Sequence, residues 1–275
     1  MLQFRKSVPK PAPGAGSPKG KSPNATLIYA DDVIGGYMFD ETGVRFTSNL
    51  LLKANATCHR IYMTDVTQKV TATTEGDPDA EGFIKKFEGM HPGDQIELTE
   101  FLEQTLGQGF IILYDADCGS NVKRLIGTPC NPLYIKASFE DSKDKLGTDL
   151  VFEARRRDRH LIKFYEGTLQ FEEPTTTTDE NVVITPANGE IYRLAPSATA
   201  NTTVSIDTMT QPHGKIISLV GQGGANPMSL PAGVNGPVTV LLKDGTAWSA
   251  LENSAIHLKV FDAGATTYLI EQSRA

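Results

Sequence analysis

From Thr26 onward the sequence consists of short runs in which apolar and polar residues alternate, separated by clusters of Gly, Asp, Asn and Pro. Between Leu133 and Phe139, for example, every second residue is apolar. An alternation of period two buries one face of a β-strand and leaves the other face wetter. Because this pattern recurs along the chain and turn residues follow each run, it predicts a mainly β fold.

The run Phe110–Tyr114 differs from the others because it is apolar throughout, which is typical of a central strand covered on both faces. Lys243–Gly245 predicts a hairpin turn between two later strands. The other expected strands are 26–29, 50–53, 60–63, 133–139, 150–154 and 163–169, followed by 182–184, 191–194, 203–206, 215–220, 238–242, 255–261 and 267–272. In 255–261 the alternation again predicts one buried face.

A single segment has helical spacing. Phe101, Leu102 and Leu106 lie on one face of a helix over residues 99–106. Thr99 can cap the start of this helix and Gly107 can end it. We therefore expect one short helix that packs against a sheet.

Composition divides the chain into four parts. Residues 1–25 form a basic arm with five prolines. This arm cannot bury enough apolar surface to become ordered alone, so we expect neighbouring copies or a partner to order it. Residues 26–172 form a first β domain. Residues 173–181 carry a run of Thr with acids and no apolar periodicity, which predicts a linker. Residues 182–275 form a second, all-β domain.

Charge is separated along the chain. The 275 residues include 26 Lys and Arg against 33 Asp and Glu, a formal net charge of −7. Five cations stand in residues 1–25 before the first acid, Asp31, and subtracting them from −7 leaves −12 on the rest. Such an acidic body does not supply the clustered cations of a large nucleic-acid surface. No apolar run approaches the ~20 residues of a membrane span, so we expect no membrane partner.

The sequence contains no pattern that predicts an enzyme or a cofactor. It has no Gly-x-Ser-x-Gly elbow, and its five histidines stand in unrelated contexts. Gly221–Gly224 follows an expected strand but precedes no helix, so it lacks the helix N-terminus that binds a phosphate. The opening residues lack the apolar core of a secretory signal, and we expect reduced thiols.

No metal site is expected. Asp77, Asp79 and Glu81 are close enough in sequence to bind a hard cation, but their spacing does not match an EF-hand loop, so we expect an acidic turn. The spacing of the three cysteines matches no zinc module, and we expect small buried or half-buried residues at Cys58, Cys118 and Cys130.

One basic cluster stands inside the acidic body, at Arg155, Arg156 and Arg157, between two expected strands. Two interpretations have equal weight: a solvated hairpin tip, and a contact with an acidic patch on an identical neighbour, because Arg pairs well with carboxylates. Contact with DNA is a third interpretation, which the surrounding negative charge disfavours.

Several stretches carry a resemblance to a known family. Residues 75–83 (EGDPDAEGF), 91–93 (HPG) and 127–133 (GTPCNPL) resemble structural proteins of tailed phages that infect Bacteroidetes. Within that group, the strands around one helix, with 147–152 (GTDLVF) and 164–167 (FYEG), are similar to the tail-tube (major tail protein) family. The resemblance covers about residues 1–172.

The resemblance implies a virion protein without enzymatic activity, made in the host cytoplasm, that self-assembles into stacked hexameric rings. It implies a β-sandwich, one sheet of which joins those of its neighbours into a barrel around the lumen, and an arm that reaches the adjacent ring. The partners would be further copies, other tail or connector proteins, and DNA in passage through an acidic lumen that repels phosphates. The expected contact residues are Phe4 as an apolar anchor, Arg5, Lys6, Arg155, Arg156 and Arg157.

Residues 182–275 resemble the decoration modules, often immunoglobulin-like, that trail virion proteins, and we expect this module outside the tube and dispensable for assembly. Trp248 is either a sugar-stacking platform there or a core residue. Two other functions stay open: a capsid decoration or head-fibre-base protein, and a carbohydrate-binding module, which for hydrolysis would need paired carboxylates in a cleft.

Overall fold

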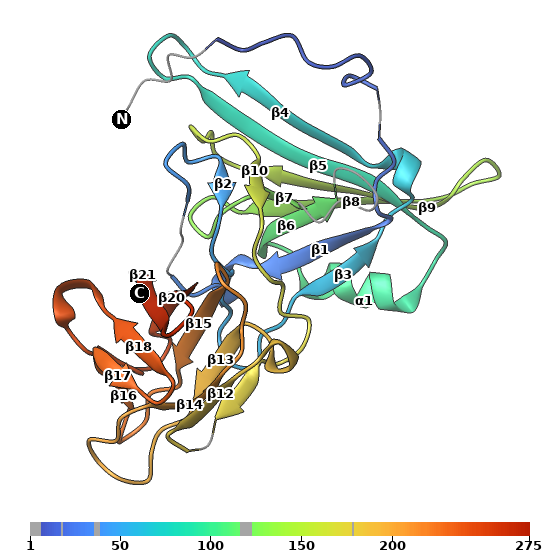
Figure 1. Cartoon of the computed structure of the whole chain (residues 1–275). Helices are drawn as coiled ribbons and strands as arrows, with labels where there is room; N and C mark the ends of the chain where they lie inside the picture. Colours follow the sequence, from blue (N-terminus) through green and yellow to red (C-terminus); the bar gives the residue numbers. More distant parts are fainter. Residues whose placement is uncertain (1–6, 18, 36–38, 116–122, 178) are drawn as a thin grey trace.

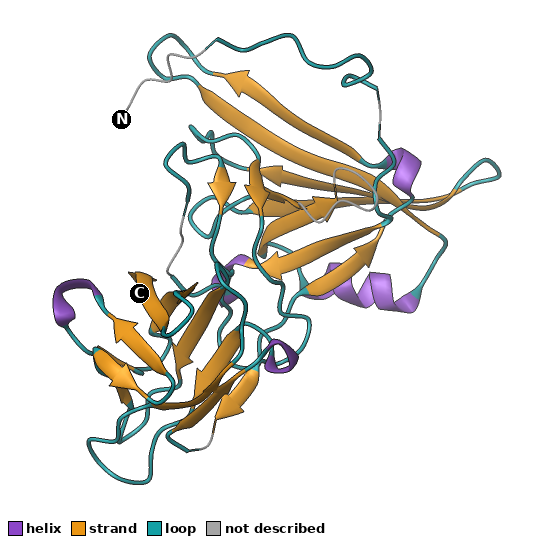
Figure 2. Ribbon diagram, viewed as in Figure 1, coloured by secondary structure: helices purple, strands orange, loops and turns teal. Residues whose placement is uncertain are grey.

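The computed structural model describes residues 7–17, 19–35, 39–115, 123–177 and 179–275. Figure 1 shows two groups of strands, one from residues 24–165 and one from residues 175–274, each built around its own large sheet. Figure 2 shows how little helix accompanies them. The prediction of a mainly β fold with one α-helix is confirmed over the described residues.

The first sheet has ten strands. Its path runs β2-β10-β7-β6-β8-β9-β5-β4, and β1 lies between β6 and β3. Two short 3-10 helices, η1 (Ala30–Asp32) and η2 (Asp65–Thr67), follow β1 and β3. The strands are β1 (Asn24–Tyr29), β2 (Arg45–Phe46), β3 (His59–Tyr62), β4 (Lys69–Glu75), β5 (Gly82–Pro92), β6 (Gly109–Asp115), β7 (Lys123–Ile126), β8 (Leu133–Asp141), β9 (Leu146–Ala154) and β10 (Lys163–Tyr165).

Strand β6 is the centre of this sheet, since it pairs with β1, β7 and β8. Phe110, Ile112 and Tyr114 pack into one buried cluster, and Ile111 and Leu113 pack into another on the opposite face. None of the five is more than 8% exposed. The prediction of a central strand covered on both faces is therefore confirmed.

Helix α1 (Ile96–Gln104) covers one of these clusters, into which Leu98, Phe101 and Leu102 pack. The helix begins before the expected Thr99, because Leu98 belongs to its buried face. Gln95 is the N-cap residue, and the Thr99 hydroxyl instead donates to the Gln95 carbonyl at 3.2 Å. The prediction that Thr99 caps the helix is thus wrong.

The end of the helix agrees with expectation. Gly107 lies three residues beyond Gln104 with φ +82°, a conformation that favours glycine, and it turns the chain into β6. Leu106 does not join the buried face, however, and is 76% exposed because the helix has already ended.

Strands β8 and β9 form a long hairpin whose tip extends beyond the rest of the sheet (Figure 1). The alternation predicted from 133 to 139 buries only Leu133 and Ile135. Ala137 is exposed and Phe139 is 54% exposed, because the hairpin continues past the residues that pack against it. The expected buried face is therefore correct for the first half of β8 and wrong for the second.

The second group of strands forms a seven-stranded sheet with the order β11-β13-β15-β20-β21-β18-β17, and two small sheets, β12 with β14 and β16 with β19. Their core lies between the large sheet and the small ones, with Trp248 at 3% exposure. Two 3-10 helices, η3 (Pro186–Asn188) and η4 (Lys243–Gly245), interrupt the strands. The strands are β11 (Thr175–Thr177), β12 (Asn181–Ile184), β13 (Ile191–Leu194), β14 (Ser205–Met209), β15 (Ile216–Gly221), β16 (Ser229–Leu230), β17 (Gly233–Asn235), β18 (Val238–Leu241), β19 (Trp248–Ser249), β20 (Ala255–Asp262) and β21 (Thr267–Arg274).

Two predictions for this part are wrong. The Thr run expected to be a linker forms β11, which pairs in parallel with β13, because backbone hydrogen bonds need no apolar periodicity. Lys243–Gly245 does not close a hairpin: η4 leads from β18 in the large sheet to β19 in a small one. Asp244 and Gly245 have the positive φ of a tight turn, but the strands on either side diverge.

The two groups of strands are in direct contact through a buried arginine. Arg193 is 2% exposed, and its guanidinium donates to the carbonyls of Leu52 at 2.8 Å and Lys53 at 2.7 Å. Glu173 forms an ion pair with its Nε at 3.2 Å. Burial lowers the pKa of Arg193, and the Glu173 carboxylate opposes that shift. A small apolar cluster joins the same surfaces: Ile34, Leu51, Ile191, Val220 and Ala255.

The outer face of β20 belongs to this contact as well. His257, expected on the wetter face of its strand, is 0% exposed. Its Nδ1 shares a hydrogen bond of 2.8 Å with the Ser218 hydroxyl, to which the Asn49 amide also donates at 3.4 Å. The loop around Asn49 therefore covers the face of β20 that the alternating pattern predicted to be exposed to solvent.

Candidate assembly surfaces

Among the described residues of the basic arm, those near its C-terminal end contact the rest of the chain. Lys21 donates to the Gln68 carbonyl, the Gln68 amide donates to the Ser22 carbonyl at 2.9 Å, and the Pro23 carbonyl accepts from Met63 at 2.8 Å. Residues 7–17 are exposed throughout, and within the described part of the chain their hydrogen bonds belong to local turns in residues 12–17. The arm is therefore fixed at residues 21–23, and residues 7–17 are accessible to a partner.

The predicted contact residues have different outcomes. Phe4, Arg5 and Lys6 lie outside the described residues. Arg155 stacks its guanidinium 3.4 Å from the ring centre of Tyr134, and Arg157 donates to the Ala80 carbonyl at 3.1 Å. Arg156 is exposed, and its side chain has no partner in the described part of the chain. Only Arg156 of the three therefore has a guanidinium free of intrachain contacts there.

The basic cluster is not the tip of a hairpin. It follows β9 and leads to Asp158, which exchanges backbone hydrogen bonds with Phe83 at the start of β5. The Asp158 carboxylate accepts from the buried Lys85 ammonium at 2.7 Å. Burial alone would raise the pKa of Asp158, but the hydrogen bonds from Lys85 and the His160 amide hold it below its ordinary value.

Helix α1 presents a row of acids to solvent. Glu97, Glu100 and Glu103 are exposed, and none makes an ion pair with another described residue. With Asp94 just before the helix, they give this end of the molecule a concentrated negative charge. A surface of this kind attracts a basic segment over about the 8 Å screening length of physiological salt.

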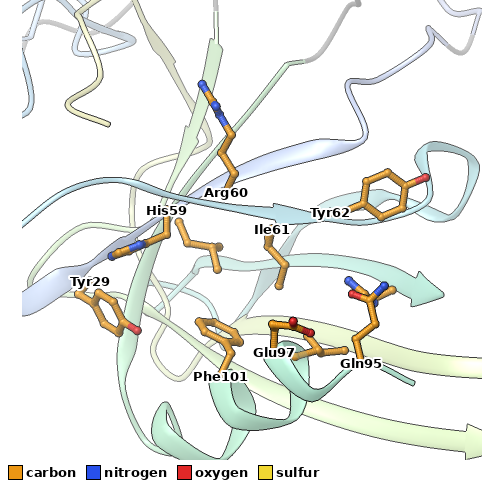
Figure 3. A pocket seen from close by; sticks show the side chains of 11 residues that line it. Tyr29, His59, Arg60, Ile61, Tyr62, Gln95, Glu97 and Phe101 are labelled. Carbon is orange, nitrogen blue, oxygen red and sulfur yellow. The ribbon is translucent and has the colours of Figure 1, made fainter. Parts of the chain in front are cut away.

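A pocket of about 300 Å³ lies between this helix and strand β3 (Figure 3). Tyr29, His59 and Tyr62 line it from β1 and β3, and Phe101 and Glu97 line it from α1. Its floor is apolar, formed by Leu27, Ile61 and Leu98. Arg60 points away from the helix, with its guanidinium 4.0 Å from the ring centre of Phe171. The pocket thus combines aromatic walls with an acidic rim.

Two polar side chains, His91 and Tyr29, line the pocket wall. His91 is 8% exposed, its ring meets Tyr62 edge-on at 6.1 Å, and its buried Nδ1 has no hydrogen-bond partner in the described structure. Burial, together with the nearby Asp32 carboxylate, raises the pKa of Tyr29, so its hydroxyl stays protonated. A buried ring nitrogen without a partner is costly.

Two strands leave long open edges on the first sheet. Among the described strands, β4 pairs with β5 alone and β3 with β1 alone. Edge strands present unpaired backbone groups that can add a strand from another chain. The arm passes above β4 without pairing with it (Figure 1).

Sequence reasoning missed the pocket. Its walls come from residues near positions 29, 60, 91 and 97, which only the fold brings together. Tyr29 ends one expected strand (26–29) and Tyr62 lies inside another (60–63), but nothing in the local pattern shows that the two strands pair with each other.

Other candidate sites do not assemble within the described residues. No group of three or more His, Cys, Asp or Glu is placed to hold a metal ion there. Cys58 is buried and Cys130 exposed, each with a free thiol, while Cys118 lies outside the described residues. The acidic residues 77–81 lie exposed in the turn between β4 and β5. Trp248 is buried in the second core, so it is not a sugar-stacking platform.

No protein-family model, curated protein or solved structure matches this chain. Within the described residues, no helix has the length and apolar character needed to cross a membrane.

Proposed function

We propose that this chain is a virion structural protein that self-assembles into stacked rings and forms a phage tail tube around passing DNA. The rings are hexameric, the first sheet forms the ring, and residues 182–275 lie outside it. The partners are other copies of the chain and the proteins at the ends of the tube. The chain acts without a cofactor and without catalysis.

The observation that carries the proposal is the arm. Residues 7–17 are exposed along their whole length, while residues 21–23 are fixed to β3 and η2 by hydrogen bonds. A basic, proline-rich segment held at one end and free at the other is suited to bridge to a neighbouring copy. The acidic body that remains offers such a segment many complementary surfaces.

The open edges of the first sheet support the ring. β4 is seven residues long and, among the described strands, has no partner along the edge that faces away from β5; β3 offers a shorter open edge next to α1. Natural sheets usually cover or blunt such edges, so uncovered ones favour pairing between copies. The exposed Phe139 and Leu146 on the β8–β9 hairpin add apolar surface for the same purpose.

The test is assembly of the purified chain with and without the arm. The chain should form rings and stacked tubes in negative-stain images. Deleting residues 1–20 should leave single rings and abolish stacking. A matched control replaces residues 1–20 by a Gly-Ser segment of equal length, which should also fail to stack. Normal tubes from either variant would contradict the role of the arm.

The symmetry of the assembly distinguishes a tail-tube protein from a capsid decoration protein. The same exposed arm would suit a capsid decoration protein that grips the head with its N-terminal segment. Six-fold stacking rings favour the tube, whereas trimers that bind only to heads favour decoration. The oligomer mass in solution distinguishes the two.

A further inference from the structure

The pocket between β3 and α1 has the chemistry of a site for a proline-rich peptide. Such peptides adopt the polyproline II conformation and dock into grooves lined by aromatic side chains. Here Tyr29, Tyr62 and Phe101 provide the aromatic surfaces and Glu97 provides an acidic rim. His91 also lines this pocket, as a mostly buried polar side chain.

The arm carries a segment that matches this pocket. Residues 8–13 read Val-Pro-Lys-Pro-Ala-Pro and all are exposed, with Val8 at 86%. A polyproline II helix has three residues per turn, so Val8 and Pro11 share one side and Lys10 and Pro13 share the next. One side is therefore apolar, and the side beside it carries an ammonium group.

We propose that the pocket of one copy binds Val8–Pro13 of the arm of another copy. The proposal rests on the assembly role of the arm and names its receptor. The side with Val8 and Pro11 packs against the apolar and aromatic lining of the pocket, and the Lys10 ammonium pairs with the Glu97 carboxylate.

The occupant is another copy because of where the arm leaves its own chain. Lys21, Ser22 and Pro23 are held against Gln68 and Met63, and the arm continues from there over β4 (Figure 1). Helix α1 lies on the other side of β1 and β3 (Figure 2). An arm that follows its anchored direction moves away from its own pocket, and a neighbouring chain can receive it.

The binding test uses the full chain and a fluorescein-labelled peptide of residues 7–22. Fluorescence anisotropy is measured at about 0.15 M salt, where the Debye length is about 8 Å. The peptide should bind, and a peptide with Pro9, Pro11 and Pro13 replaced by Ala should bind about tenfold more weakly. That variant keeps every charge, so equal affinity of the two peptides would overturn the proposal.

Variants of the chain locate the binding site. Glu97→Lys and Tyr62→Ala should each weaken peptide binding about tenfold, which corresponds to about 1.4 kcal/mol. Glu100→Lys is the matched control, because it makes the same charge change on the same helix at an exposed residue that does not line the pocket. It should weaken binding less than about threefold. Equal losses from Glu97→Lys and Glu100→Lys would show general charge attraction and refute the site.

Three further outcomes distinguish failure of this proposal from failure of the one it rests on. If the unmodified chain stacks into tubes and Tyr62→Ala and Glu97→Lys stack equally well while remaining folded by circular dichroism, the pocket is not the receptor, although the tube stands. If no rings form but the peptide binds with the expected pattern of variants, the tube fails and the pocket stands. If the chain stays monomeric and binds peptide only after residues 1–20 are deleted, the arm occupies its own pocket and the contact between copies is refuted.

Discussion

Replacing Arg193 by Met should destabilise the contact between the two groups of strands. The substitution removes two charge-assisted hydrogen bonds, to the carbonyls of Leu52 and Lys53 at 2.8 and 2.7 Å, each worth roughly 1.5–3 kcal/mol. It also removes the desolvation of a guanidinium that is 2% exposed, which offsets part of the loss. We expect a net loss of about 3 kcal/mol in the free energy of unfolding.

The fluorescence of Trp248 allows unfolding of the second group of strands to be measured separately. It is the single Trp of the chain and is buried in the second core, so its fluorescence reports unfolding of residues 175–274, while far-ultraviolet circular dichroism reports all strands. In Arg193→Met the Trp transition in urea should shift to lower denaturant and separate from the circular dichroism transition. Arg45→Met is the control, because Arg45 makes an exposed ion pair with Glu166 and should change stability by less than about 1 kcal/mol. Equal stability of Arg193→Met and Arg45→Met would refute the reasoning.

Two other predictions concern ionisable groups. Burial raises the pKa of the Cys58 thiol to about 11, so this thiol stays protonated at pH 8. Iodoacetamide should therefore alkylate the exposed Cys130 in the folded chain and reach Cys58 only after unfolding. Equal labelling of both cysteines in the folded chain, measured by mass spectrometry, would contradict this prediction. Hydrogen bonds from Lys85 and the His160 amide lower the pKa of Asp158 in the folded chain, although burial opposes them. This shift stabilises the fold fully above the pKa of about 3.9 that an Asp has in the unfolded chain. The stabilisation is lost as the pH falls through the lower pKa of the folded state. Asp158→Asn should therefore lower the unfolding midpoint by a constant amount above about pH 5 and by less below about pH 4, and a difference that does not shrink in acid would argue against the ion pair.

The sequence allows prediction of those elements whose signal is local. The apolar run Phe110–Tyr114 identified the central strand because both faces of a central strand are buried. The Thr residues of β11 carried no such signal, because that strand is held by backbone pairing with β13 and most of it is exposed. The residues of η4 predicted a hairpin turn, which is wrong, because the divergence of the strands beside the turn depends on the whole fold.

One part of the candidate site, the arm, can be predicted from the sequence, and the other part, the pocket, cannot. The arm is visible in composition, because its prolines and cations mark a segment without a core of its own. The pocket is not visible, because Tyr29, Tyr62, His91 and Phe101 come from four elements that meet only through tertiary packing. The burial of Arg193 is equally hidden, since its partners are carbonyls far away in the sequence.

The most direct test of the account is the mass and shape of the particle that the full chain forms in solution. Light scattering coupled to size exclusion, with negative-stain images of the same fractions, should give six-fold rings and, at higher protein concentration, stacked tubes. A chain that remains monomeric at every concentration tested would contradict the account.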